Sequence, residues 1–192
     1  MKKFFALMLC LVMVLGLVAC GAKADGGNGG ASANVDVASP EELLSNVFAL
    51  YAEDEKFPVG GGDAENMVMD APGAMNVADA ETIDYMVGLP AGSIDKVDAV
   101  ASALHMMNAN TFTAGCYHVA DSANTEAVIK ALQENIQARQ WMCGIPEGLV
   151  ICTVGDYVVS AFGAQQLLDT FTGHLNAAYE GAVTTVVSEP IA

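Results

Sequence analysis

Three side chains in the second half of the sequence have the chemistry of soft-metal ligands or of a nucleophile and its base. Cys116 and His118 lie two residues apart in an apolar stretch typical of a strand, so both side chains point to one face. Cys152 lies in a second such stretch, and with Cys143 the three body cysteines allow three disulfide pairings, among which the sequence does not select. A zinc site needs about four ligands, and Cys–His catalysis needs a base within reach of the thiol and a group that orients it. A fourth ligand and an orienting group are not evident, so a packed Cys beside a half-exposed His is favoured, and no catalytic residue, metal or cofactor is predicted.

Other residues whose side chains could bind metal or react fit common structural roles. Met67-x-Met69 and Met106-Met107 suit Cu(I) ligation, but core filling is the more typical role of methionine. The acidic residues between positions 63 and 84 lack the spacing of a calcium loop, so a solvated acidic face is expected. The motifs of serine hydrolases, phosphate-binding loops and zinc proteases are absent from the sequence, so the chain is not expected to be an enzyme.

A fourth cysteine, near the N-terminus, lies in a more specific pattern. Lys2 and Lys3 precede an apolar run over residues 4–18, which is shorter than the roughly 20 residues of a membrane-spanning helix. The run ends in Leu17-Val18-Ala19-Cys20-Gly21, which resembles the lipobox of bacterial lipoproteins. That resemblance implies that residues 1–19 are a signal peptide, cut just before Cys20, whose thiol carries lipid such as palmitate. The alternatives are a plain secretory signal or an uncleaved anchor, but an Ala-x-Ala type site is missing at the end of the run.

The segment that follows Cys20 separates this leader from the folded part of the chain. Residues 21–34 contain no large apolar side chain, so they cannot bury enough surface to offset the entropy of ordering. We therefore expect a flexible Gly/Ala-rich tether over residues 20–38 and a single domain over residues 39–192, best defined between 82 and 180.

The periodicity of the domain predicts alternating strands and helices. Ser39, Pro40 and Glu42 form a helix start with an N-cap, a first-turn proline and a capping box. The apolar spacing predicts helices over 40–55, 79–87, 121–140 and 165–179, and strands over 67–69, 97–107, 111–119, 149–154 and 157–162. The order strand-strand-helix thus occurs twice. It predicts an α+β fold in which an antiparallel four-stranded sheet has both helices on one face, with the N-terminal helix covering remaining apolar surface.

The segment Met106-Met107-Asn108-Ala109-Asn110-Thr111-Phe112-Thr113-Ala114-Gly115-Cys116-Tyr117-His118-Val119-Ala120-Asp121 is similar to a hairpin in the bacterial lipoprotein family known as domain of unknown function 4358. Members of that family join a lipobox and a tether to a domain of about this size, and the resemblance covers about residues 82–179. Cys116 and His118 depart from the family pattern, which often has aliphatic and basic residues there. The resemblance implies a location and a fold but no activity.

Charge and anchoring together restrict the function. The formal net charge of −16 disfavours nucleic acid as a partner, because phosphate contacts require cations. We expect a lipoprotein held by lipid on Cys20 at the extracytoplasmic face of the cell membrane. Its domain would bind an envelope protein or a small ligand without catalysis. The alternative is an envelope metal-binding protein or enzyme that uses Cys116, His118 and Cys152.

Overall fold

An antiparallel sheet of eight strands is the centre of the computed structural model, which describes residues 35–191. Its hydrogen-bonded order is β2-β1-β4-β5-β7-β6-β8, and β3 pairs with the same edge of β4 as β1 does, at the other end of that strand. The strands are β1 Val59–Gly61, β2 Val68–Met69, β3 Gly73–Met75, β4 Ala99–His105, β5 Phe112–His118, β6 Gly148–Val154, β7 Tyr157–Gly163 and β8 Val183–Pro190.

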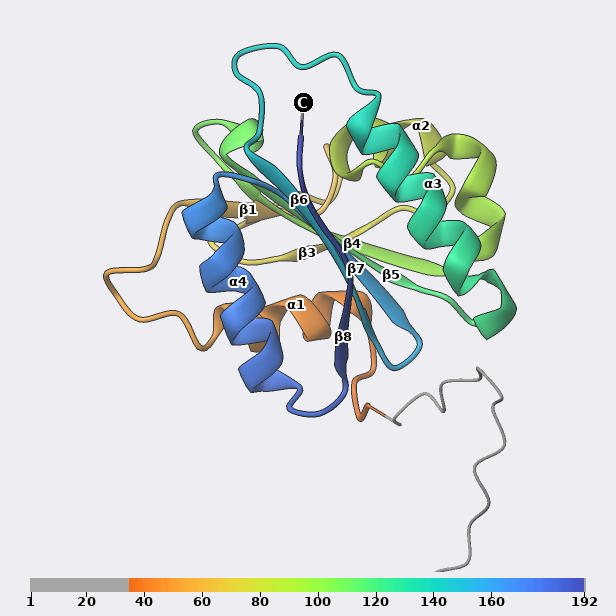
Figure 1. The fold of residues 1–192 in the computed structure, drawn as a ribbon, viewed down its shortest axis with the longest axis horizontal. Coiled ribbons are helices and arrows are strands. Elements are labelled where there is room, and N and C mark those ends of the chain that lie inside the picture. The colour runs from red at the N-terminus through yellow and green to blue at the C-terminus, as the bar shows by residue number, and fades with distance from the viewer. Residues whose placement is uncertain (1–34, 192) are drawn as a thin grey trace, which may run out of the picture. The chain divides into compact units, whose positions relative to one another are not determined.

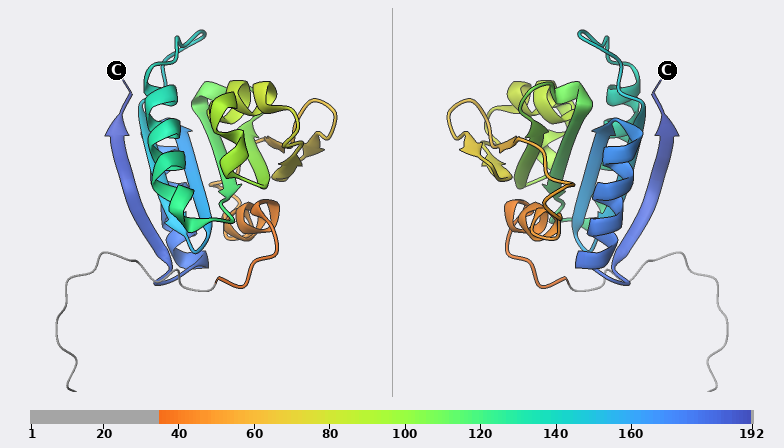
Figure 2. Two further views of the ribbon diagram at one scale, coloured as in Figure 1. Left: turned by 90° about the vertical axis from the view of Figure 1, so that its right-hand side faces the viewer. Right: turned by 90° about the vertical axis from the view of Figure 1, so that its left-hand side faces the viewer.

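Helices cover both faces of this sheet (Figure 1). They are α1 Pro40–Phe48, α2 Ala80–Val87, α3 Thr125–Gln137 and α4 Gln165–Ala178, joined by short 3₁₀ turns at Ala91–Lys96, Ala109–Thr111 and Ser122–Asn124. Figure 2 shows α2 and α3 in front of the sheet in one view and α4 in front of it in the opposite view. Among the residues described, no helix combines the length and the apolar character needed to cross a membrane.

The fold is therefore α+β, but the sheet differs from the expected one in size and in how it is covered. The expected strands form its centre in the order β4-β5-β7-β6, and the repeated strand-strand-helix order is confirmed. The expectation of four strands with both helices on one face is wrong, because further strands flank the centre and α3 and α4 pack on opposite faces. The reason is that the central strands are apolar on both sides. On β6, Ile151 joins the core under α3 and Val150 the core under α4, so each face needs a cover.

The start of α1 follows from local sequence alone. The Ser39 hydroxyl accepts a hydrogen bond from the Glu42 backbone N–H at 3.1 Å, and the Glu42 carboxylate accepts one from the Ala38 N–H at 2.9 Å. The helix ends at Phe48 rather than near Glu55, because the next residues turn back and the Tyr51 ring stacks on Phe48 at 4.9 Å. In the same way α3 ends at Gln137, three residues before the expected end.

Both predicted hairpins are confirmed. The turn between β4 and β5 contains Asn108, whose side chain accepts a hydrogen bond from the Asn110 N–H. The turn between β6 and β7 is Gly155-Asp156, with Gly155 at φ 58°, a left-handed conformation that glycine adopts without strain. Strand β8, which the apolar spacing does not predict, pairs with the outer edge of β6. These pairings fix which side chains lie over each face.

Candidate functional site

The three residues considered first, Cys116, His118 and Cys152, lie on the sheet face that α1 and α4 cover. Cys116 on β5 and Cys152 on β6 are both paired with Val159 of the intervening β7. Two strand spacings place their backbones about 10 Å apart. His118 lies at the end of β5, where its ring contacts Tyr157 at 5.0 Å and Nδ1 is hydrogen-bonded to Asp98. The structure therefore does not assemble the three into one site.

Burial also changes the chemistry of the two strand cysteines. Cys116 is 0% exposed, and its desolvation raises the pKa of the thiol well above the ordinary value, although a backbone hydrogen bond at Tyr117 lowers it. Desolvation likewise raises the pKa of Cys152, against the opposing effect of its hydrogen bond with Thr185. Cys116, Cys143 and Cys152 are all free thiols. Within residues 35–191, no group of three or more His, Cys, Asp or Glu side chains is arranged to hold a metal ion.

The other sequence candidates have mixed outcomes. Cys20, the predicted lipidation site, lies outside the described residues. Core filling is the wrong role for the paired methionines, since Met67 is 60%, Met69 is 59% and Met107 is 80% exposed. They lie at the sheet edge and in a turn, where too few apolar neighbours are available to cover them.

The acidic segment is also only partly the solvated face that was expected. Asp63 is 5% exposed, and its carboxylate accepts hydrogen bonds from the backbone N–H groups of Glu65, Asn66 and Asn76. Burial alone would raise the pKa of Asp63, but these hydrogen bonds together lower it. This carboxylate therefore organises the segment between β1 and β3, and its hydrogen-bonding capacity is already used.

A cleft on the other face of the sheet has the features of a ligand site. Its volume is about 550 Å³, within the range of small-ligand pockets. It opens between α2, the C-terminal end of α3 and the segment that leads from α3 to β6. The lining residues are Glu81, Asp84, Tyr85, Asn110, Asn135, Ala138, Arg139, Gln140, Trp141 and Met142. We call this cavity the Arg139 cleft.

The cleft contains the only Arg and the only Trp of the chain, and the two side chains contact each other. The Arg139 guanidinium lies 5.2 Å from the centre of the Trp141 ring and 5.8 Å from that of Phe162. Its Nη2 donates to the backbone carbonyl of Asp84 at 2.7 Å. Burial lowers the pKa of Arg139 and the nearby Asp84 carboxylate raises it, but an arginine in this setting stays charged at neutral pH.

Hydrogen-bonding capacity remains unused in the cleft. Arg139 forms no salt bridge with any residue that the structure describes. The Asp84 carboxylate accepts hydrogen bonds from Asn135 at 2.8 Å and from the Ala91 N–H at 3.4 Å. The Trp141 Nε1 is buried and has no hydrogen-bond partner among the described residues. The guanidinium thus keeps unused donors beside an open cavity.

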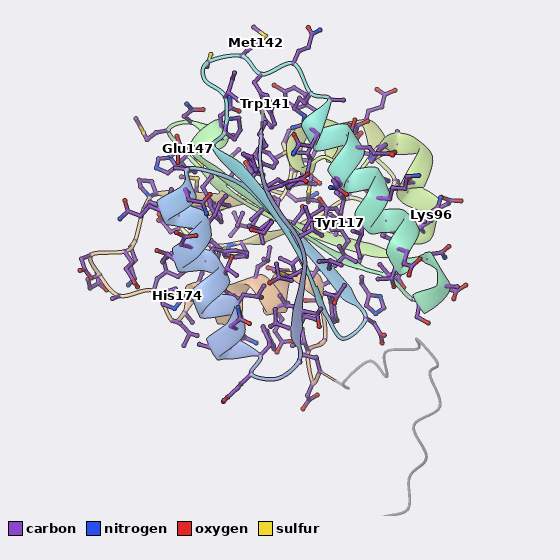
Figure 3. The ribbon with its side chains drawn as sticks, in the orientation of Figure 1. Lys96, Tyr117, Trp141, Met142, Glu147 and His174 are labelled. Carbon is purple, nitrogen blue, oxygen red and sulfur yellow. The ribbon has the colours of Figure 1, made fainter. Side chains whose placement is uncertain are left out.

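The wall that carries Trp141 is held in place by the β4–β5 turn. Asn110 Nδ2 donates to the carbonyls of Met142 at 2.6 Å and Gly144 at 2.7 Å, and Asn108 Nδ2 donates to that of Cys143 at 3.3 Å. Figure 3 places Trp141 and Met142 on this segment, which rises beyond the end of the sheet. The turn that supports it belongs to the stretch that carries the family resemblance.

Two of the side chains that line the cleft are large, apolar and exposed. Tyr85 is 83% and Met142 is 80% exposed. Large apolar side chains gathered beside a cavity are typical of binding surfaces. A second cavity of about 400 Å³ lies near α1 and is lined mainly by the apolar side chains of Phe48, Phe57 and Val59. Because the Arg139 cleft combines charge, polar groups and aromatic rings, it is the stronger candidate.

Sequence reasoning missed this site. Neither Arg139 nor Trp141 belongs to a motif that the sequence analysis singled out. A usable signal did exist, since the single Arg and the single Trp lie two residues apart in a strongly acidic chain. Comparison of the chain with protein-family models, with curated proteins and with solved structures finds no match.

Proposed function

We propose that this protein is a bacterial lipoprotein whose domain is anchored at the extracytoplasmic face of the cell membrane by lipid on Cys20. The order of Lys2 and Lys3, an apolar run and Ala19-Cys20 supports the anchor, and residues 20–38 would serve as its tether. The resemblance of residues 106–121 to the lipoprotein family of domain of unknown function 4358 supports the same assignment. An acidic domain on a tether would stand away from anionic headgroups.

The biochemical role that we propose is noncatalytic binding of a ligand in the Arg139 cleft. One observation carries this proposal: the Arg139 guanidinium keeps unused donors beside an open cavity. Buried polar groups are normally paired with protein, water or ligand, so donors left over beside a cavity favour binding. The burial of the Cys116 thiol favours a binding role over the alternative of an enzyme or a metal-binding protein.

Metabolic labelling with a fatty-acid probe tests the anchor. The native chain should incorporate label and fractionate with membranes, whereas Cys20→Ser should incorporate none. Cys143→Ser is the matched control, because it removes an exposed cysteine from the domain and should leave labelling unchanged. Equal labelling of the Cys20→Ser variant and the native chain would contradict the anchor.

The fluorescence of the single Trp tests the binding site, since Trp141 lines the cleft. The full chain in detergent micelles is titrated with the low-molecular-mass fraction of a cell-envelope extract. Emission should change to saturation in the native protein and stay unchanged in Arg139→Gln. Lys130→Gln is the control, since Lys130 is an exposed residue of α3 that pairs only with Glu134 at 3.7 Å. Turnover of an envelope substrate that depends on Cys116 or His118 would contradict the noncatalytic role.

A further inference from the structure

The groups that line the Arg139 cleft can be sorted by whether their hydrogen-bonding capacity is already used. A guanidinium has five N–H donors in a fixed planar fork. Among the described residues, only the hydrogen bond to the Asp84 carbonyl uses one of those donors. A fork with several free donors matches the two oxygens of a carboxylate. The cleft therefore has one position suited to an anionic group with two oxygens.

The surrounding charge restricts which anion fits. The chain has a formal net charge of −16, and Glu81 and Asp84 line the same cleft as Arg139. If the ligand were a multiply charged phosphate or sulfate, the two carboxylates beside the single cation would repel it. A carboxylate with a single charge incurs the smallest repulsion. The electrostatics thus favour a monocarboxylate.

The polar groups around Arg139 indicate that more than a simple organic acid is bound. The side-chain amides of Asn110 and Asn135 both donate through Nδ2 to protein groups, and no described residue donates to the Oδ1 of either. The two free amide acceptors, in addition to the arginine donors, complement a peptide backbone, which presents N–H and C=O groups in alternation.

The remaining wall residues fit the other parts of such a ligand. Glu81 is exposed, lines the cleft and forms no hydrogen bond or ion pair with a described residue, so its carboxylate is free to attract an amino group. The rings of Trp141 and Tyr85 and the thioether of Met142 offer apolar contact, and methionine adapts to side chains of different shape. Such walls would accept peptides with varied side chains, while Arg139 and Glu81 would bind the charged carboxyl and amino termini.

We propose that the Arg139 cleft binds the carboxyl-terminal end of a short peptide, with the terminal carboxylate on Arg139 and the amino group toward Glu81. This inference rests on the proposed binding function and names its ligand class. It predicts dependence on a free terminal carboxylate and little dependence on side chains.

The experiment uses the full chain in detergent micelles and follows Trp141 emission and heat of binding. The probes are Ala-Ala-Ala, its carboxyl-terminal amide and its N-acetyl derivative. Ala-Ala-Ala should bind to saturation, and the amide should bind at least about ten-fold more weakly because the charge-assisted pair with Arg139 is lost. Arg139→Gln should bind acid and amide equally, and Lys130→Gln should behave as the native chain does.

A second variant separates ligand recognition from folding. Glu81→Gln changes an exposed carboxylate and should keep the native circular dichroism spectrum. It should weaken binding of Ala-Ala-Ala but not of N-acetyl-Ala-Ala-Ala, which has no charged amino group. This difference would place the amino end of the peptide beside Glu81.

Each other outcome overturns a defined part of the proposal. Equal binding of acid and amide by the native chain would overturn recognition of the terminal carboxylate, and acetate binding as tightly as the tripeptide would overturn recognition of a peptide. If peptides fail to bind while the envelope fraction still changes Trp141 emission, the ligand class is wrong and the proposed binding function stands. If neither changes the emission, both proposals fail.

Discussion

The two faces of the sheet differ in how their polar and reactive groups are used. Under α1 and α4, Cys116 and Cys152 are packed into an apolar core and His118 is paired with Asp98. Beside α2 and α3, Arg139 keeps unused donors next to an open cleft. The residues with the more reactive chemistry therefore lie on the face covered by α1 and α4. Polar groups without hydrogen-bond partners beside a cavity thus indicate a binding site better than residue type does.

The largest effect on stability is expected from a substitution that creates a cavity on the face covered by α1 and α4, which we call the closed face. Phe171 is 2% exposed and packs against Phe112 at 5.4 Å and Phe48 at 6.1 Å. Phe171→Ala should lower the free energy of unfolding by about 3–5 kcal/mol, because it removes a buried ring and leaves a void. Denaturant unfolding measures this change. A cost close to that of an exposed substitution would show that this face is not tightly packed.

The buried carboxylate of Asp63 contrasts with the free donors of Arg139, since both of its oxygens accept hydrogen bonds from the protein. Asp63→Ala should lower stability at neutral pH by about 1–3 kcal/mol, because buried backbone N–H groups lose their acceptor. The folded-state pKa of Asp63 is lowered, so its contribution is present above the ordinary pKa of Asp and is lost as pH falls through the lowered value.

Unfolding curves at several acidic pH values check this sign. The native chain should lose stability over that interval more steeply than Asp63→Ala does. Parallel pH profiles for the two proteins would contradict the role of the charged form. Asp70→Asn is the control, since Asp70 is exposed in the same segment and Asn also tolerates its left-handed backbone at φ 59°.

A thiol reagent compares closed and open positions directly. At neutral pH the exposed Cys143 should be alkylated promptly in the folded protein, whereas Cys116 and Cys152 should react only after unfolding. The reason is twofold: burial blocks access, and it raises the pKa of both buried thiols so that little thiolate forms. Mass spectrometry of the labelled peptides measures the three rates. Prompt labelling of Cys116 would show that the closed face opens, and Cys116 would again be a candidate catalytic or metal-binding residue.

The smallest effect is expected at the exposed ion pair on α3. Lys130 and Glu134 are 72% and 69% exposed in their side chains, so Lys130→Gln should change the free energy of unfolding by less than about 1 kcal/mol. It should also leave the response of Trp141 to ligand unchanged. A clear loss of binding in this variant would show that general charge, rather than the cleft, controls recognition.

Local features of the fold could be predicted from the sequence, and features set by distant partners could not. The cap of α1 lies within residues 38–42, and Gly155 and Asp156 form the β6–β7 turn, so both follow from short-range chemistry. Strand β8 has an edge position and an uneven burial pattern, and its place is decided by pairing with β6. The placement of α3 and α4 on opposite faces likewise depends on the two-sided apolar character of the assembled sheet.

The candidate site could not be predicted because its walls come from separate parts of the chain. Glu81 belongs to α2, Asn110 to the turn before β5, and Trp141 to the segment after α3. Spacing along the chain gives no sign that they converge. Cys116 and Cys152 show the reverse case, since a plausible pair of residue types is separated by a whole strand.

Titration of Trp141 emission with the low-molecular-mass envelope fraction tests most directly whether the Arg139 cleft is a ligand-binding site. We expect the emission to change to saturation in the native full-length chain and in Lys130→Gln, and to stay unchanged in a folded Arg139→Gln variant. Identical curves for the native chain and Arg139→Gln, or a flat response in both, would contradict a binding role for the cleft.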